Sequence, residues 1–211
     1  MFEQSLKFFV VFFVVIDPVS LIPLFTGLTT GASTEYKRRM ALKAVMISAT
    51  ILLLFALGGA AFLQLMGISL EAFRIFGGLL LFLLALEMVF ARESGTRTSS
   101  DEAAESRRRA DISVFPLAFP FIAGPGALAT ILLWFGRIHL PAQAGLFAAF
   151  IAAAALVLAI VVALLWVAEP LMRVIGVTGA NVASRILGVI LGALAVQFVL
   201  DGLRQAFAAA G

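Results

Sequence analysis

The sequence predicts an all-α membrane protein whose six transmembrane helices form two inverted-topology three-helix repeats. Three observations support this fold class: a very apolar composition, six long apolar stretches, and two short motifs that each occur once in either half of the chain. Helices 1 and 4 of the six are expected to be broken near the membrane midplane, because they contain the paired prolines.

Composition defines the class of protein. Of the 211 residues, 63% are hydrophobic and 13% charged, whereas soluble domains are about half apolar and about a quarter charged. The chain has no cysteine and one histidine, His139, which argues against disulfides, thiol chemistry and Cys/His zinc sites. Its net charge of +3 is too small to indicate nucleic-acid binding, so we expect the lipid bilayer and no nucleic acid among its partners.

Six stretches are long enough to cross a bilayer, which takes about 20 apolar residues of helix. They lie at 5–28, 41–66, 72–91, 113–136, 143–167 and 183–208. The first follows Lys7 as a signal peptide would, but it lacks a small-residue cleavage site and continues past Pro18 and Pro23, so we expect it to be retained.

The basic residues predict an orientation, because cytoplasmic loops carry an excess of Lys and Arg. Six spans place eleven of them on one side: Lys37, Arg38, Arg39, Lys43, Arg92, Arg97, Arg107, Arg108, Arg109, Arg173 and Arg185. The other side receives four: Lys7, Arg74, Arg137 and Arg204. We therefore expect the first side to be cytoplasmic and both termini to lie outside. Arg74 and Arg185 open their spans and are expected to reach the headgroups.

A polar segment divides the chain. Residues 92–111 are rich in Ser, Thr, Arg and acids, which predicts a charged cytoplasmic linker. The Arg107–Arg109 run fits the charge bias of this linker better than a nucleic-acid or anionic-lipid patch, because no aromatic residues interleave it. The predicted domains are a first three-helix repeat at 1–91, the linker at 92–111 and a second, inverted repeat at 112–211.

Two motifs recur in the same order in the two halves. Pro-x4-Pro occurs at 18–23 and at 120–125, and Arg-Ile-x-Gly at 74–77 and at 185–188. Three spans per half is an odd number, so the second half must cross the membrane in the opposite sense. Inverted repeats with interrupted helices at corresponding places are typical of transporters that bind their substrate near mid-membrane.

The second interruption predicts a carboxylate site. Proline removes an N–H and disrupts helical bonding, and lipid cannot satisfy the freed backbone groups. A half-helix that begins with Pro125 presents free N–H groups and a positive dipole end near Gly124 and Gly126. Thr130 follows the same segment and is a candidate for the pathway. The alternative is a simple packing kink, which fits one broken helix better than two at matched positions.

Asp17 is the most specific single candidate for a functional residue inside the membrane. It lies near the centre of the first span, where an acid costs about 2.5–3.5 kcal/mol on the insertion scale. Two roles fit it, and they do not exclude each other: it is an N-cap for a half-helix that starts at Pro18, or it binds a coupling cation, a proton or a substrate ammonium group. The matching position in the second half is Phe119. One acid and one bare helix N-terminus would suit a zwitterion, with the ammonium near Asp17 and the carboxylate near Gly126.

No enzyme motif is present. The sequence has no H-E-x-x-H, no G-x-S-x-G and no G-x-x-x-x-G-K, so we expect no catalytic residues and no bound cofactor or metal. A coupling proton or sodium ion remains open. The candidate substrate-binding residues are Asp17, Pro18, Ser20, Pro23, Ala123, Gly124, Pro125, Gly126 and Thr130.

Segments 16–25 and 115–127, which contain the two proline motifs, resemble the MarC family of multi-pass membrane proteins, as do 185–188 and 195–198. The resemblance covers essentially the whole chain. It implies a six-span protein of a bacterial or archaeal cytoplasmic membrane that moves small neutral amino acids such as glycine or alanine. Family members often carry Gly-Asn after Asp-Pro-Leu, and Val19-Ser20-Leu21 replaces that pattern here. Ser20 therefore leaves the substrate open.

Two other functions remain as alternatives: a membrane subunit or sensor without transport activity, and a passive channel for small solutes. A homo-oligomer is also compatible with the sequence. Glycines spaced four apart at Gly27 and Gly31, and at Gly188 and Gly192, serve either helix packing within one chain or contacts between protomers.

Overall fold

The structure, a computed structural model, describes residues 2–90, 111–138 and 142–210. Every regular element among these residues is helical. Nearly all of the predicted linker and His139 lie outside the described residues.

Each predicted span is covered by one helix or by a pair of helices. In chain order they are α1 (Phe2–Ile16), α2 (Pro18–Leu28), α3 (Thr34–Leu65), α4 (Leu70–Phe90), η1 (Ser113–Ile122), α6 (Pro125–Phe135), α7 (Ala144–Trp166) and α8 (Ala168–Ala210). Within the described residues, five stretches are long and apolar enough to cross a membrane, with α1 and α2 together forming the first. The sixth is the pair of η1 and α6, which meet at a bend of 54°.

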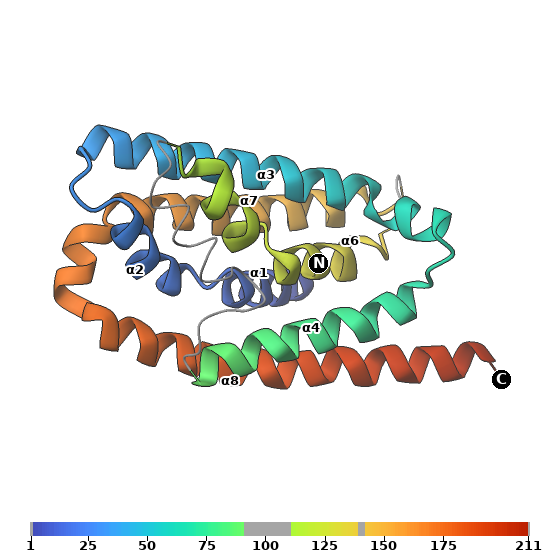
Figure 1. The fold of residues 1–211 in the computed structure, drawn as a ribbon. Coiled ribbons are helices and arrows are strands. Elements are labelled where there is room, and N and C mark those ends of the chain that lie inside the picture. The colour runs from blue at the N-terminus through green and yellow to red at the C-terminus, as the bar shows by residue number, and fades with distance from the viewer. Residues whose placement is uncertain (1, 91–110, 139–141, 211) are drawn as a thin grey trace.

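Two helices extend beyond their predicted spans. α3 begins at Thr34 rather than near 41, because the Ser33 side chain accepts a hydrogen bond from the Tyr36 N–H and caps an earlier start. α8 begins at Ala168 rather than near 183, and it changes direction at Gly176, whose φ of 66° lies in the left-handed region. Its first turns therefore form an arm at one end of the bundle (Figure 1).

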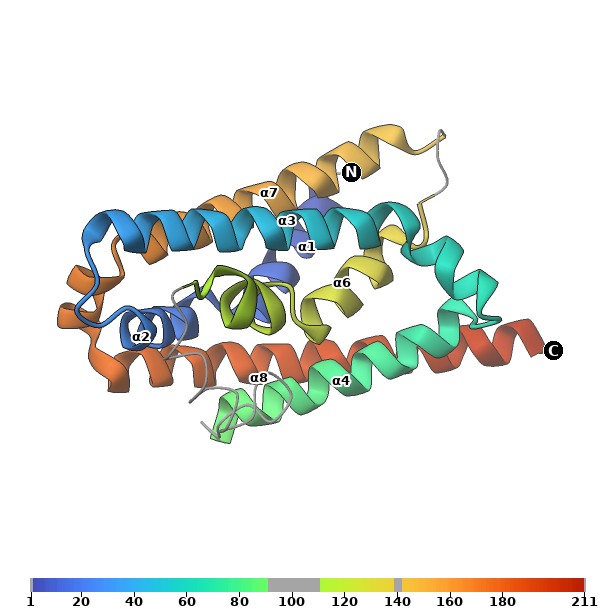
Figure 2. The same cartoon turned by 45° about the horizontal axis from the view of Figure 1, so that its top comes forward.

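The helices form three layers. α3 lies beside α7 on one side of the bundle and α4 lies beside α8 on the other, as Figures 1 and 2 show from two directions. The shorter segments α1, α2, η1 and α6 fill the space between them. Each outer layer thus contains one helix from either half of the chain, and the interrupted helices lie in the interior.

Glycines allow α4 and α8 to pack closely along their length. A Cβ at Gly78 would lie 2.9 Å from the Ala195 carbonyl oxygen, and one at Gly188 would lie 2.7 Å from the Met88 Cβ. Gly188 and its neighbour four residues on, Gly192, therefore contact α4 of the same chain. This arrangement matches the packing role of the Gly-x3-Gly pair within one chain.

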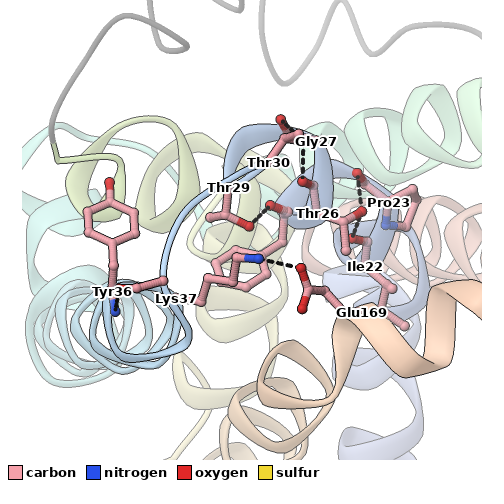
Figure 3. A network of polar contacts seen from close by, with 11 residues as sticks. Ile22, Pro23, Thr26, Gly27, Thr29, Thr30, Tyr36, Lys37 and Glu169 are labelled. Atoms are coloured by element: carbon pink, nitrogen blue, oxygen red, sulfur yellow. Dashed lines mark hydrogen bonds and ion pairs between the residues drawn. The ribbon is translucent and has the colours of Figure 1, made fainter.

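Polar contacts tie the elements together at both ends of the bundle. At one end Lys37 of α3 forms an ion pair with Glu169 of α8 (Figure 3), and Trp166 Nε1 donates to the Arg38 carbonyl oxygen. At the other end Arg137, which follows α6, donates to Gln205 near the end of α8. The last turns of α8 lie at this second end (Figure 1), and Phe8 of α1 packs on Trp134 and Phe135 near the end of α6.

Arg74 departs from expectation. It is 7% exposed rather than extended toward headgroups, and its Nε lacks a hydrogen-bond partner. Its side chain lies against Gly202 of α8, since a Cβ at that glycine would be 3.3 Å from the Arg74 Cγ. The close α4–α8 packing therefore encloses the arginine. Arg185 is exposed, and it lies inside α8 rather than at the start of that helix.

Candidate functional site

The first interruption is a single residue. α1 ends at Ile16, Asp17 adopts a left-handed conformation with φ 50° and ψ 66°, and α2 begins at Pro18. Asp17 Oδ1 accepts a hydrogen bond of 3.3 Å from the Ser20 N–H, which is the N-cap role, one of the two roles that the sequence offers for this residue. α2 continues through Pro23, so the second proline of the motif lies inside a helix.

Threonine hydroxyls bind the carbonyls along the second half of α2. Thr26 Oγ1 donates to the carbonyl oxygens of Ile22 and Pro23, and Thr29 Oγ1 donates to that of Phe25 (Figure 3). Pro23 is half-buried in this hydrogen-bonded helix. Its ring lies within a regular helix rather than at the interruption.

Asp17 connects this interruption to α8. Its side chain is 1% exposed, and its Oδ2 accepts a hydrogen bond of 2.6 Å from the Ser184 hydroxyl. Ser184 in turn accepts one of 2.8 Å from the Ser20 hydroxyl. Three oxygen-bearing side chains from α2, α8 and the residue between α1 and α2 therefore form one chain of hydrogen bonds inside the bundle.

The second interruption is longer and carries no acid. Within η1, Phe115 and Phe119 have extended backbone conformations, each directly before a proline, where sterics disfavour the helical region. η1 ends at Ile122, and α6 begins at Pro125 with Gly124 as its N-cap and no side chain bound there. This start at Pro125 is the one predicted from the sequence.

Gly124 is required by close packing at this turn. Its φ of −72° is ordinary for any residue, but a Cβ there would lie 2.1 Å from the Pro120 carbonyl oxygen. Gly126 is similarly enclosed, since its Cβ would lie 3.1–3.3 Å from the ends of Leu84, Val15 and Leu81. Glycine at these two positions therefore lets the backbone pack directly against the Pro120 carbonyl group and against side chains of α1 and α4.

A small cavity lies beside this interruption. Its volume of about 20 Å³ is enough for roughly one water molecule. It is lined by Val15, Leu80, Leu84, Pro120, Phe121, Gly124, Pro125, Gly126 and Ala127. Gly126 and Ala127 belong to the first turn of α6, where backbone N–H groups have no partner within the helix. The cavity therefore combines an apolar wall with the positive end of a helix.

The structure divides the predicted site residues into two groups. Gly124, Pro125 and Gly126 line the cavity, together with Val15 from the end of α1, and Ala123 is buried directly before them. Thr130 is buried but donates to the Gly126 carbonyl oxygen at 2.9 Å, within its own helix.

The predicted residues of the first half form the second group. Asp17, Pro18, Ser20 and Pro23 do not line the cavity. Asp17 binds Ser184 instead, so its carboxylate and the start of α6 do not face one pocket in this conformation. Nothing in the sequence singles out Ser184 except its position directly before the Arg-Ile-x-Gly motif, where the first half has Phe73.

Charged groups are sparse around these interruptions. Among the described residues no basic side chain forms an ion pair with Asp17, and no group of three His, Cys, Asp or Glu residues is placed to hold a metal ion.

Asp111, by contrast, lies at the entrance of η1 and pairs with Lys43. Hydrogen bonds from Lys43 and from Ser113 lower the pKa of Asp111 to about 2.

Comparison with known proteins assigns the chain to a family. Residues 2–207 match the model of the MarC family integral membrane proteins. The UPF0056 membrane protein YhcE of Escherichia coli is 35% identical over 206 residues, which cover 98% of this chain and 94% of that protein. A UPF0056 membrane protein of Aquifex aeolicus is 36% identical over 200 residues, covering 94% and 92%. No solved structure matches the chain. The protein is thus a member of the MarC family of integral membrane proteins.

Proposed function

We propose that this protein is a secondary transporter that moves small neutral amino acids, such as glycine or alanine, across the cytoplasmic membrane of a bacterium or archaeon. Its halves act as inverted repeats, with the broken helices between them, and it works by alternating access. The end of the bundle that carries Lys37 and Lys43 faces the cytoplasm, and both termini face outside.

One observation carries the proposal. The first and fourth predicted spans are each interrupted at a Pro-x4-Pro motif, before Pro18 in one and before Pro125 in the other, and the interruptions lie in the interior layer of the bundle. Val15, two residues before the first interruption, lines the same cavity as Gly124 and Gly126 of the second. Irregular backbone at membrane depth is tolerated when it is buried in protein or lines a cavity, and transporters build their binding sites from it.

The start of α6 suits the carboxylate of an amino acid. Its first-turn N–H groups and dipole favour an anion, and Gly126 leaves the backbone bare at that point. Small apolar walls from Val15 and Leu84 fit a substrate with little or no side chain. A cavity of about 20 Å³ is too small for glycine, so binding requires α6 to move away from α1 and α4, as alternating access would provide.

Asp17 admits two roles in this mechanism. As a partner for the substrate ammonium group it must leave Ser184 and enter the widened cavity, with Ser20 near it. As an ion site it acts from its present position, bound to Ser184. The hydrogen bonds favour the second role, because they already satisfy both carboxylate oxygens.

Two other functions compete with this one. A membrane subunit or sensor without transport activity leaves the matched interruptions without a purpose. A passive channel would need a continuous polar path, whereas apolar side chains surround the cavity. We do not propose an enzyme.

The decisive experiment is counterflow of radiolabelled glycine and alanine in proteoliposomes. The native protein is compared with Gly126→Leu, which fills the start of α6, and with the matched control Gly58→Leu. Gly58 is an exposed glycine of α3 where an added Cβ meets nothing within 4 Å. We expect saturable exchange in the native protein and in Gly58→Leu, and its loss in Gly126→Leu.

The other outcomes separate the alternatives. Flux that does not saturate and shows no counterflow indicates a channel. Folded protein that neither exchanges nor binds an amino acid rejects the transport proposal. A changed glycine affinity in Asp17→Asn favours the ammonium role of Asp17, whereas an unchanged affinity counts against that role.

A further inference from the structure

The hydrogen-bonded chain of Asp17, Ser184 and Ser20 is the most unusual polar feature of the bundle interior. We propose that Asp17 is the binding site for a transported proton, and that Ser184 communicates its protonation to α8. This inference rests on the transport function proposed above. It adds the coupling ion and a residue, Ser184, for which the sequence gives no role.

Burial is the first argument. Asp17 is 1% exposed and lies near the middle of the first span, Phe2–Leu28. A carboxylate in such a place is stabilised by a cation, by hydrogen bonds or by taking up a proton. In the described parts of the chain no cationic side chain pairs with it, so hydrogen bonds and protonation are what remain.

The neighbouring elements carry few charges that face Asp17. Residues 125–135 of α6, 144–166 of α7 and 18–28 of α2 contain none. On α1 the charged residues are Glu3 and Lys7, which pair with each other near its start. On α8 the nearest is Arg185, which follows Ser184 but is exposed. The other charged residues of α8 lie nearer its two ends: Glu169, Arg173, Asp201 and Arg204. Among the described residues, no charged side chain of these elements forms an ion pair with Asp17.

The geometry favours a proton over a metal cation. The oxygen atoms of Asp17 and Ser184 lie 2.6 Å apart, and those of Ser184 and Ser20 lie 2.8 Å apart. These are hydrogen-bond lengths. A metal cation held about 2.4 Å from each oxygen would push them apart, whereas a proton needs no extra space.

Protonation changes what Ser184 can do. With Asp17 ionised, the Ser184 hydroxyl donates to the carboxylate, and its oxygen accepts from Ser20. When a proton binds, an O–H bond forms on the carboxyl group, which becomes able to donate to Ser184 in turn. A hydrogen bond to a charged group is roughly twice as strong as one between neutral groups. The connection between the α1–α2 interruption and α8 therefore loosens on protonation, which makes movement of the two halves depend on the proton.

Glycine transport in proteoliposomes tests the proposal in two modes. Counterflow at equal pH on both sides requires the carrier alone, whereas accumulation driven by a pH gradient requires the proton site. For one proton per glycine, a gradient of one pH unit accumulates glycine about tenfold in the native protein. In Asp17→Asn the accumulation driven by the gradient is expected to fall to that of empty liposomes, and the ratio of this accumulation to counterflow in the same vesicles is the quantity compared with the native protein.

Ser184 is tested with a conservative pair and a matched control. Ser184→Ala is expected to shift the pH at which glycine uptake is half-maximal, and Ser184→Thr, which keeps a hydroxyl, to restore it. The control Thr29→Val removes a hydroxyl that is equally enclosed but donates only to the Phe25 carbonyl oxygen of its own helix. A purely structural role of Ser184 would lower uptake equally at every pH and would overturn its part of the proposal.

An infrared measurement does not depend on transport. In lipid nanodiscs, a pH-difference spectrum of the native protein should contain the carbonyl stretch of a protonated carboxyl group that Asp17→Asn lacks. If the native protein shows counterflow but no response to a pH gradient, or if the two spectra are identical, the proton site is rejected and the transport function stands. If the native protein shows no counterflow, the transport function falls and the transported proton with it.

Discussion

The backbone at the two interruptions of this bundle is stabilised by different chemistry. The first is one residue long, and its Asp17 carboxylate caps the following helix and binds α8. The second begins α6 at a glycine with no side-chain cap, and its glycines pack against backbone and aliphatic side chains. A polar network thus holds one interruption, and steric fit holds the other.

The difference extends to the partner helices. Under the alignment of the repeated motifs, Asp17 corresponds to Phe119 and Ser184 to Phe73. Both members of the polar pair therefore have aromatic counterparts in the other half. The two halves therefore differ in chemistry where their motifs correspond, with a carboxylate at one interruption and a bare helix start at the other.

The largest loss of stability is expected for Gly124→Ala. Its Cβ would lie 2.1 Å from the Pro120 carbonyl oxygen, so the backbone must shift. We expect a loss of about 3 kcal/mol in the free energy of unfolding, measured in detergent with denaturant. In the control Gly27→Ala the Cβ meets nothing within 4 Å of it, and stability should stay level or rise. Equal stability of the two variants would show that steric fit does not hold the second interruption.

Ser184→Ala is expected to cause the second-largest loss of stability. It removes the hydroxyl that donates to Asp17, and hydrogen bonds to charged groups contribute about 1.5–3 kcal/mol. We expect a loss of about 2 kcal/mol at neutral pH in the same unfolding assay. Thr29→Val should cost less than about 1 kcal/mol, because the Phe25 carbonyl oxygen still accepts from the Thr29 N–H. An unchanged free energy of unfolding in Ser184→Ala would show that the polar network does not stabilise the first interruption.

Gly126→Ala should have a smaller effect. Its Cβ would meet the flexible ends of Leu84, Val15 and Leu81 at 3.1–3.3 Å, which can yield by a few tenths of an ångström. We expect a loss of about 1 kcal/mol in unfolding free energy, whereas Gly58→Ala should stabilise α3 slightly. A stabilising Gly126→Ala would mean that the walls at the start of α6 are not closely packed.

The smallest effect concerns the acid at the entrance to the second half. The pKa of Asp111 is lowered to about 2 by hydrogen bonds from Lys43 and Ser113. A lowered pKa stabilises the fold above the ordinary value of 3.8, and this contribution is lost as pH falls toward 2. The difference in melting temperature between the native protein and Asp111→Asn should therefore be small near neutral pH and vanish below about pH 2. If this difference in melting temperature grew as the pH fell, the lowered pKa of Asp111 would be contradicted.

Much of the fold follows from the sequence. Apolar length located the six spans, because a bilayer about 30 Å thick requires a fixed length of helix. Proline chemistry predicted the start of α6 at Pro125 and the cap at Asp17. Proline alone was a poor guide to the extent of the first interruption, since Pro23 lies inside α2. Neighbouring carbonyls there accept hydrogen bonds from the Thr26 hydroxyl.

Local sequence by itself determined which segments enter the membrane and where two of them break, because hydropathy and proline geometry act over a few neighbouring residues. Only the tertiary structure decided what each break faces. Asp17 and Ser184 are 167 positions apart, and Val15 lies beside Gly126, which is 111 positions further along the chain. Such contacts depend on how six helices pack, and a lone serine or a buried Arg74 looks the same in sequence whether it faces lipid, water or another helix.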